Sequence, residues 1–303
     1  MMLRPPLQYQ SLKVVLLHMD ANSRLQISLQ MPSIRNFERM IPLKMSRFKM
    51  EEFGTKINDT WKWCGISKTW SEKIRRFEYN RKLFEAVKHL NSFLFGNRTM
   101  PIHVGSFVFC FAGGIFRLPP NFRLQANDVH VTRLSVVNEK LPLLVENSET
   151  LDSLYMYYSL TPNDFQSQIV RNAKRLVLVE VSKNVMQELF PTIRDLPHRD
   201  LSIMPRRSFL PEDYFQIIEA WLSGNRSIGA SCWIRISTDE MASEILKLVR
   251  TRNEGTNETN RGVTIPRNDS SKVEVFYVPF EGPINNYHFS RGNQTMKIRI
   301  VEV

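Results

Sequence analysis

Residues 175–182 read Arg-Leu-Val-Leu-Val-Glu-Val-Ser, and this stretch decides the fold class. The first seven residues form a short apolar run, which predicts a buried strand. Ser182 is a good helix N-cap, because its hydroxyl can accept a hydrogen bond from a backbone N–H of the first helical turn. We therefore expect a strand that is followed directly by a helix.

The same order of strand, cap and helix recurs through the C-terminal half. Strands are predicted at 151–157, 200–204 and 232–236, and the helix starts that follow them are Thr161-Pro162-Asn163-Asp164, Pro211-Glu212-Asp213 and Ser237-Thr238-Asp239-Glu240. The last of these matches a capping box and leads a helix to Val249. Strands that alternate with helices are typical of the α/β class.

The spacing of these units suggests a repeat. Leu154 to Leu178 is 24 residues and Leu178 to Leu201 is 23, within the range of leucine-rich repeats, although the next step to Trp233 is longer. One strand–helix unit cannot cover its own apolar strand, whereas stacked units share a continuous core. We expect residues 151–303 to form a leucine-rich-repeat-like or irregular α/β solenoid; the alternative is an ordinary α/β layer domain. Residues 251–272, which are poor in hydrophobes, are expected to be a mobile loop before closing strands at 273–280 and 296–303.

The N-terminal stretch 11–39 has a helical pattern. Its apolar residues recur three and four positions apart in three short bursts, which are Leu12, Val15, Leu16 and Met19, then Leu25 and Leu29, then Ile34 and Phe37. Pro32 separates the second burst from the third, because proline disfavours a helical residue before it. We expect three short helices, which should pack on the following segment or on a partner.

The middle of the chain mixes strands with one helix. Apolar and basic residues alternate over 41–50 and again over 55–63, which predicts two strands, with Gly54 between them. Residues 70–97 place apolar side chains at helical spacing among many Lys and Arg, so they indicate an amphipathic helix with a basic outer face. Further strands are expected within 104–116 and 129–137.

Several short motifs in the first half resemble the nematode F-box C class. They are the segment from Ser11 to Ile34, Ile41-Pro-Leu-Lys44, Ile57-Asn-Asp-Thr60, Phe116-Arg-Leu-Pro-Pro120 and Leu134-Ser-Val-Val137. Their order carries the resemblance, which implies a divergent F-box at 1–40, a family domain of unknown function at 41–150, and a leucine-rich-repeat-like region at 151–303. The Leu-Pro-acidic opening of a typical F-box is replaced here by Leu7-Gln8-Tyr9-Gln10-Ser11.

The resemblance also implies a partner. An F-box docks on the adaptor subunit of a cullin-type ubiquitin ligase, while the rest of the chain recognises a protein substrate. Matching the F-box pattern assigns adaptor contact to six residues, namely Leu12, Val15, Leu16, Met19, Leu25 and Leu29. The alternative from the residues alone is that these side chains are buried against the strands from Ile41 onward.

The chain carries 41 Lys and Arg against 30 Asp and Glu, a formal charge of +11 that attracts polyanions and acidic protein surfaces. A nucleic-acid-binding protein is therefore the alternative function, with the 70–97 helix as the interface: Arg75, Arg76, Arg81, Lys82, Lys88 and Arg98 lie there among Phe77, Tyr79 and Phe93. On an amphipathic helix the rings would instead face inward.

Motifs for catalysis are missing from the sequence. It contains no G-x-S-x-G, no phosphate-binding P-loop and no H-E-x-x-H, and its six His are scattered. Cys64, Cys110 and Cys232 form no C-x-x-C pair. We expect a non-catalytic interaction protein with no metal or cofactor. The first apolar stretch is interrupted by Lys13, His18 and Asp20, so we expect an intracellular protein, cytoplasmic or nuclear, with no membrane partner.

Overall fold

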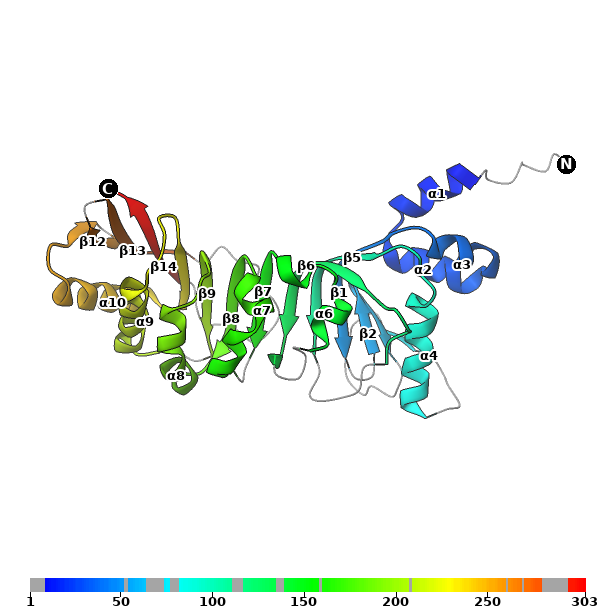
Figure 1. The fold of residues 1–303 in the computed structure, drawn as a ribbon, viewed down its shortest axis with the longest axis horizontal. Helices are drawn as coiled ribbons and strands as arrows, with labels where there is room; N and C mark the ends of the chain where they lie inside the picture. Colours follow the sequence, from blue (N-terminus) through cyan, green and yellow to red (C-terminus); the bar gives the residue numbers. More distant parts are fainter. Residues whose placement is uncertain are drawn as a thin grey trace. The chain divides into compact units, whose positions relative to one another are not determined.

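The protein is described by a computed structural model that covers residues 9–51, 54–63, 74–76, 82–110, 117–134, 139–157, 160–206, 209–259, 261–268, 270–279 and 294–303 (Figure 1). The chain divides into two compact units. Unit 1 consists of residues 1–131 and 136–148, and unit 2 of residues 132–135 and 149–303. Both units combine helices with strands, which confirms the predicted α/β class. None of the helices within these ranges has the length and apolar character that crossing a bilayer requires.

Unit 1 begins with the three short helices that the sequence predicts. They are α1 (Tyr9–His18), α2 (Ala21–Gln30) and α3 (Pro32–Arg39). Asp20 caps α2, because its carboxylate accepts hydrogen bonds from the backbone N–H groups of Asn22 and Ser23 at 2.8 and 3.2 Å. Pro32 occupies the first position of α3, where its missing N–H costs nothing.

The sheet of unit 1 has the strand order β4-β3-β2-β1-β5-β6. Its strands are β1 (Leu43–Glu51), β2 (Gly54–Ile57), β3 (Thr60–Trp63), β4 (Ile74–Arg76), β5 (Ile102–Phe109) and β6 (Leu124–Val131). β1, β5 and β6 run parallel, whereas β1, β2 and β3 form an antiparallel meander that turns at Asn58, with φ of 50°. The predicted strand over 55–63 is therefore two strands.

Two helices belong to the rest of unit 1, α4 (Leu83–Phe95) and α6 (Leu141–Leu144). The predicted continuous helix over 70–97 is wrong, because residues 74–76 form strand β4 and α4 starts only at residue 83. The strands predicted within 104–116 and 129–137 end at residues 109 and 131, and residues 111–116 and 135–138 lie outside the described ranges. Four rings, Phe48, Phe95, Phe107 and Phe122, pack together in the core.

His130 on β6 is a titratable group of this sheet. Burial, reinforced by the nearby positive charge of Arg47, lowers the pKa of His130 from 6.5 to about 3. Between pH 6.5 and about pH 3 the native imidazole is therefore neutral, whereas the imidazole of an unfolded chain carries the proton. Below pH 6.5 this proton uptake favours the unfolded state, so His130 makes unit 1 less stable as the pH falls toward 3.

We expect the variant His130→Gln to lose less stability than the wild type between pH 7 and pH 5. Each pH unit below the unfolded pKa of a histidine costs about 1.4 kcal/mol, so the difference should approach about 2 kcal/mol. Urea unfolding of both proteins at the two pH values measures it. Parallel losses in the two proteins would contradict a neutral native His130.

Unit 2 contains four parallel strands in chain order, β7 (Ser153–Tyr157), β8 (Arg175–Val181), β9 (Asp200–Pro205) and β10 (Ser231–Ile236). β10 then pairs antiparallel with β14 (Gln294–Glu302), which continues to β13 (Ser271–Pro279), β12 (Gly262–Asn268) and β11 (Asn257–Thr259). The strands predicted at 151–157, 175–181, 200–204 and 232–236 are thus present with nearly the predicted bounds.

Helices follow the parallel strands of unit 2 as the sequence predicts. They are α7 (Gln168–Asn172), α8 (Lys183–Arg194), α9 (Pro211–Ser223) and α10 (Asp239–Arg252), with short 3-10 turns η1 (Ser148–Thr150) and η2 (Pro162–Gln166). The Ser182 hydroxyl accepts from the Val185 N–H at 3.5 Å, and the Thr238 hydroxyl accepts from the Met241 N–H at 3.2 Å. Thr161 opens the 3-10 turn η2 in place of a regular helix.

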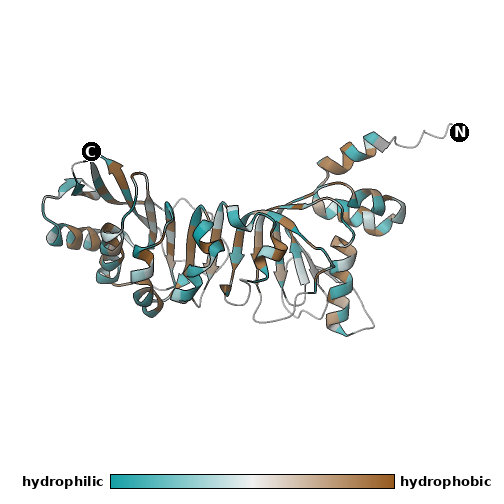
Figure 2. Cartoon of the chain, viewed as in Figure 1, coloured by the Kyte–Doolittle hydropathy of each residue, from teal (hydrophilic) through white to brown (hydrophobic). Residues whose placement is uncertain are grey.

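The helices α8, α9 and α10 lie side by side along the unit 2 sheet (Figure 1). The strand side chains beneath them are almost fully buried, among them Leu178, Ile203, Ile234 and Ile298. Figure 2 shows apolar residues concentrated in the strands, while the helices are mixed. This sheet therefore has one face that is covered by helices.

The loop predicted at 251–272 is wrong. α10 extends to Arg252, and most of the segment forms β11, β12 and the start of β13. Val263 and Ile265 are buried on one side of β12, and two such residues suffice to hold a strand that is paired with β13. The low content of apolar residues predicts a loop, but the alternation of Val263 and Ile265 with polar neighbours is that of a strand.

Arg226 follows α9 and is buried at the end of α8. Its guanidinium donates to the backbone carbonyls of Ile193, Leu196 and His198 and stacks on the Trp221 ring, 3.7 Å from the ring centroid. The carbonyls at a helix C-terminus carry partial negative charge, so a cation is favourable there. This contact ties the end of one strand–helix unit to the start of the next.

Candidate functional site

The N-terminal helices of unit 1 carry the six predicted partner-binding residues, which differ in how far they are buried. Leu16 and Leu25 are buried in the core of unit 1, with 1% and 3% of their surface exposed. Val15 is exposed, whereas Leu12, Met19 and Leu29 are partly buried. Leu16 and Leu25 therefore belong to the chain's own core, which is the alternative that the sequence left open for all six residues.

The outer side of α1 exposes three apolar side chains beside the polar Ser11, Lys13 and His18. Val14, Val15 and Leu17 have 55%, 46% and 38% of their surface exposed, and Figure 2 shows α1 as one of the most apolar helices of the chain. Leu16 points the other way and anchors the helix. We call Val14, Val15 and Leu17 the α1 apolar face. Sequence periodicity missed Val14 and Leu17, because it shows that a helix has an apolar side but not which side is covered.

Hydrogen bonds attach α2 to the strands of unit 1. The Asn22 amide donates to the Ile57 carbonyl at 2.9 Å, and the Asn58 amide donates to the second carboxylate oxygen of Asp20 at 3.0 Å. The Asn58 side-chain oxygen in turn accepts from the backbone N–H groups of Ser46 and Arg47. The start of α2, next to the end of α1, is therefore fixed to the turn between β2 and β3.

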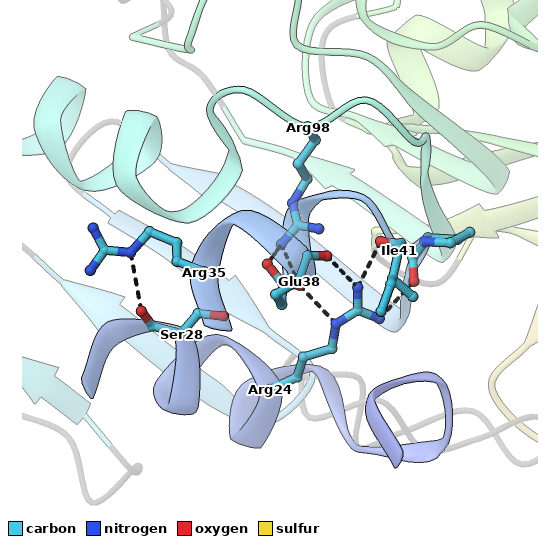
Figure 3. Close-up of polar contacts among 7 residues, drawn as sticks. Arg24, Ser28, Arg35, Glu38, Ile41 and Arg98 are labelled. Atoms are coloured by element: carbon cyan, nitrogen blue, oxygen red, sulfur yellow. Dashed lines mark hydrogen bonds and ion pairs between the residues drawn. The ribbon is translucent and has the colours of Figure 1, made fainter. Parts of the chain in front are cut away.

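A buried charged cluster fixes α3 as well (Figure 3). The Glu38 carboxylate accepts from Arg24 Nε at 2.7 Å, and both of its oxygens accept from Arg98 Nη2 at 2.7 Å. The three side chains are only 2–4% exposed. Arg24 also donates to the backbone carbonyls of Glu38, Ile41 and Pro42. The cluster links α2, α3 and the segment after α4.

The cluster places two guanidinium groups against one carboxylate. Burial lowers the pKa of Arg24, and the charge of Glu38 opposes that shift. Two nitrogens of Arg98, Nε and Nη1, have no hydrogen-bond partner among the described residues. Glu38 is therefore the central residue, since its carboxylate compensates both buried cations.

Replacing Glu38 by Ala should lower the free energy of unfolding by about 3–5 kcal/mol, because it leaves two buried cations without a counter-charge. Urea unfolding measures the loss. Glu139→Ala, at an exposed carboxylate of the same unit, is the matched control and should change stability by less than about 0.5 kcal/mol. Equal effects of the two variants would show that the cluster does not hold the helices.

The residues of the expected nucleic-acid interface do not lie on one continuous helix. Arg75 and Arg76 lie on β4, Lys88 lies on α4, and Arg98 is buried against Glu38. Phe77, Tyr79 and Arg81 lie outside the described residues. The Phe93 ring lies against Arg35, whose guanidinium carbon is 4.1 Å from the ring centroid. The cations of this segment are therefore distributed over separate elements.

The other reactive side chains show no assembled centre within the described ranges. No group of three or more His, Cys, Asp or Glu side chains there could hold a metal ion. Burial raises the pKa of the Cys110 thiol, and it raises that of Cys232 to about 12, so both thiols are poor nucleophiles. Cys64 lies outside the described residues.

Comparison with known proteins places the chain in a family. A family model described as a domain of unknown function (DUF3557) matches residues 82–238, from the start of α4 to the start of α10. No curated protein and no solved structure matches the chain significantly. The matched region extends across residue 150, where the sequence predicts the boundary between the domain of unknown function and the repeat-like region. It does not include α1, α2 and α3.

Proposed function

We propose that this chain, which belongs to the DUF3557 family, is a non-catalytic interaction protein that docks on the adaptor subunit of a cullin-type ubiquitin ligase through α1. Its strand–helix region would present a protein substrate to the ligase. A cytoplasmic or nuclear location is part of this proposal. The observation that carries it is the α1 apolar face, which stays exposed although α1 is anchored by Leu16.

Rigidity of the helical module supports docking. The Asp20 and Asn58 contacts and the Glu38 cluster hold α2 and α3 on the strands of unit 1, so the two helices that follow α1 are fixed without a partner. Pre-ordering reduces the entropy cost of association. Exposed apolar side chains on an ordered helix are what a complementary apolar groove on a partner can bury.

The resemblance to the F-box C class supports the identity of the partner. The motifs that carry it include the α1 and α2 segments, which lie outside the DUF3557 match. We now assign adaptor contact to Val14, Val15 and Leu17, together with the partly exposed Leu12, Met19 and Leu29. Leu16 and Leu25 would act indirectly by holding the helices in place.

The arrangement of unit 2 supports the second part of the proposal. β7, β8, β9 and β10 stand side by side in chain order, all parallel, and α8, α9 and α10 follow the same order. This is the arrangement expected of stacked strand–helix units such as leucine-rich repeats. The antiparallel strands β11 to β14 then close one edge. We propose that residues 151–303 act as an irregular solenoid that binds the substrate.

The double variant Val14→Asp with Leu17→Asp should weaken binding to the purified adaptor subunit by at least about tenfold, because it places charges in an apolar contact. Isothermal titration calorimetry with the full chain measures the affinity. Both positions are exposed, so the unfolding midpoint should not change.

Met40→Asp is the matched control, since Met40 is an equally exposed apolar side chain of the same module but lies outside α1. It should bind the adaptor as the wild type does. Unchanged affinity of the double variant would exclude α1 as the docking helix. Failure of the wild type to bind would exclude the adaptor as the partner.

A further inference from the structure

The second face of the unit 2 sheet has its own set of side chains. Residues paired directly across strands share a face. The rows that the register gives on this face include Arg175, Asp200, Ser231, Arg299, Glu274 and Thr264; then Tyr155, Val177, Ser202, Trp233, Lys297, Phe276 and Gly262; then Arg235, Thr295 and Val278; then Pro266, Lys272 and Val301. Val177 and Thr295 are buried on this face, whereas Arg175 on β8, Trp233 on β10 and Arg299 on β14 are exposed.

Trp233 is the most prominent side chain of this surface. The residue is 44% exposed, and the Lys297 ammonium nitrogen lies 4.1 Å from a ring centroid. The indole N–H donates to the Ser231 hydroxyl at 3.1 Å, and that hydroxyl donates to the Asp200 carboxylate at 2.7 Å. These contacts hold an exposed tryptophan in one orientation, and pre-oriented tryptophans are frequent anchors of protein interfaces.

The same face carries a shallow hollow of about 380 Å³ on β12, β13 and β14. Phe276, Glu274 and Arg299 line it. Arg299 pairs with Glu274 at 2.6 Å, and its guanidinium carbon is 4.9 Å from the Phe276 ring centroid. Gly262 stands opposite Phe276, where an added Cβ would come within 2.9 Å of the Phe276 Cβ.

The charges of this face favour an acidic ligand. Its cations are Arg175, Arg235, Lys272, Lys297 and Arg299, and its carboxylates are Asp200 and Glu274. Both carboxylates are already engaged, Asp200 by the Ser231 hydroxyl and Glu274 by Arg299. Lys297, whose ammonium lies over the Trp233 ring, places positive charge next to this exposed apolar side chain. A segment with carboxylates around an apolar side chain matches this pattern.

Single-stranded nucleic acid fits the same face less well. Base stacking needs open ring faces, but Lys297 covers one side of Trp233 and Arg299 lies over Phe276.

We call the residues of these rows the Trp233 face. We infer that the Trp233 face binds an acidic polypeptide segment, which places an apolar side chain on Trp233 and carboxylates beside Lys297, Arg235 and Arg299. Identifying the owner of that segment as the ligase substrate rests on the proposed function. The binding itself requires no adaptor.

Fluorescence anisotropy with the full chain tests this inference. The probe is a labelled glutamate-rich peptide with one central leucine, compared with the same peptide carrying glutamine in place of every glutamate and with a labelled oligothymidine. We expect the acidic peptide to bind at least about tenfold more tightly than the glutamine peptide. Trp233→Ala should weaken it by at least about fivefold, and the double variant Lys297→Glu with Arg299→Glu by at least about tenfold.

Lys247→Glu is the matched control, because it reverses an exposed cation on α10, and it should change the affinity by less than about twofold. Unfolding midpoints confirm that the variants fold. Absence of peptide binding, equal affinity for the glutamine peptide, tighter binding of oligothymidine, or an unaffected Trp233→Ala variant would each overturn the inference. The α1 double variant should bind the peptide normally and Trp233→Ala should bind the adaptor normally, so the two proposals fail independently.

Discussion

The architecture of unit 2 depends on the way parallel strands must be connected. Two parallel neighbours cannot be joined by a tight turn, so the chain has to cross over one face of the sheet, and such crossovers are right-handed in almost all proteins. When successive strands are added in chain order on the same side, every crossover falls on the same face. β7 to β10 follow this order, and α8, α9 and α10 accordingly share one face. The Trp233 face is a consequence of this constraint.

Local signals were sufficient to predict much of unit 2. Ser182 and Thr238 form their cap contacts with the next turn, and the apolar run at 175–181 is a strand with those bounds. Each of these features is decided by residues a few positions apart. The α/β class could therefore be predicted from the sequence, and so could the three short helices at the N-terminus.

Long-range contacts decided what the sequence could not predict. Arg98 belongs to a buried cluster with Arg24 and Glu38, which are distant in sequence, so its charge was read as part of a basic helix. Val14 and Leu16 are equally apolar, and only the packing of α1 on unit 1 distinguishes the exposed one from the buried one. A signal for Trp233 did exist: in 232–236 it alternates with Cys232, Ile234 and Ile236, which puts it on the opposite face.

The contacts of Arg226 limit how such an array can evolve. Arg226 follows α9 but binds the carbonyls that end α8, and Arg267 of β12 donates to the carbonyls of Gly224 and Arg226. Arg226 and Arg267 thus join neighbouring segments of unit 2, and each of them makes its contacts at one particular junction. Duplication or deletion of one segment would separate a buried guanidinium from its carbonyl acceptors. The segments of this chain are therefore not interchangeable modules, and its length can vary more easily at the edges than in the middle.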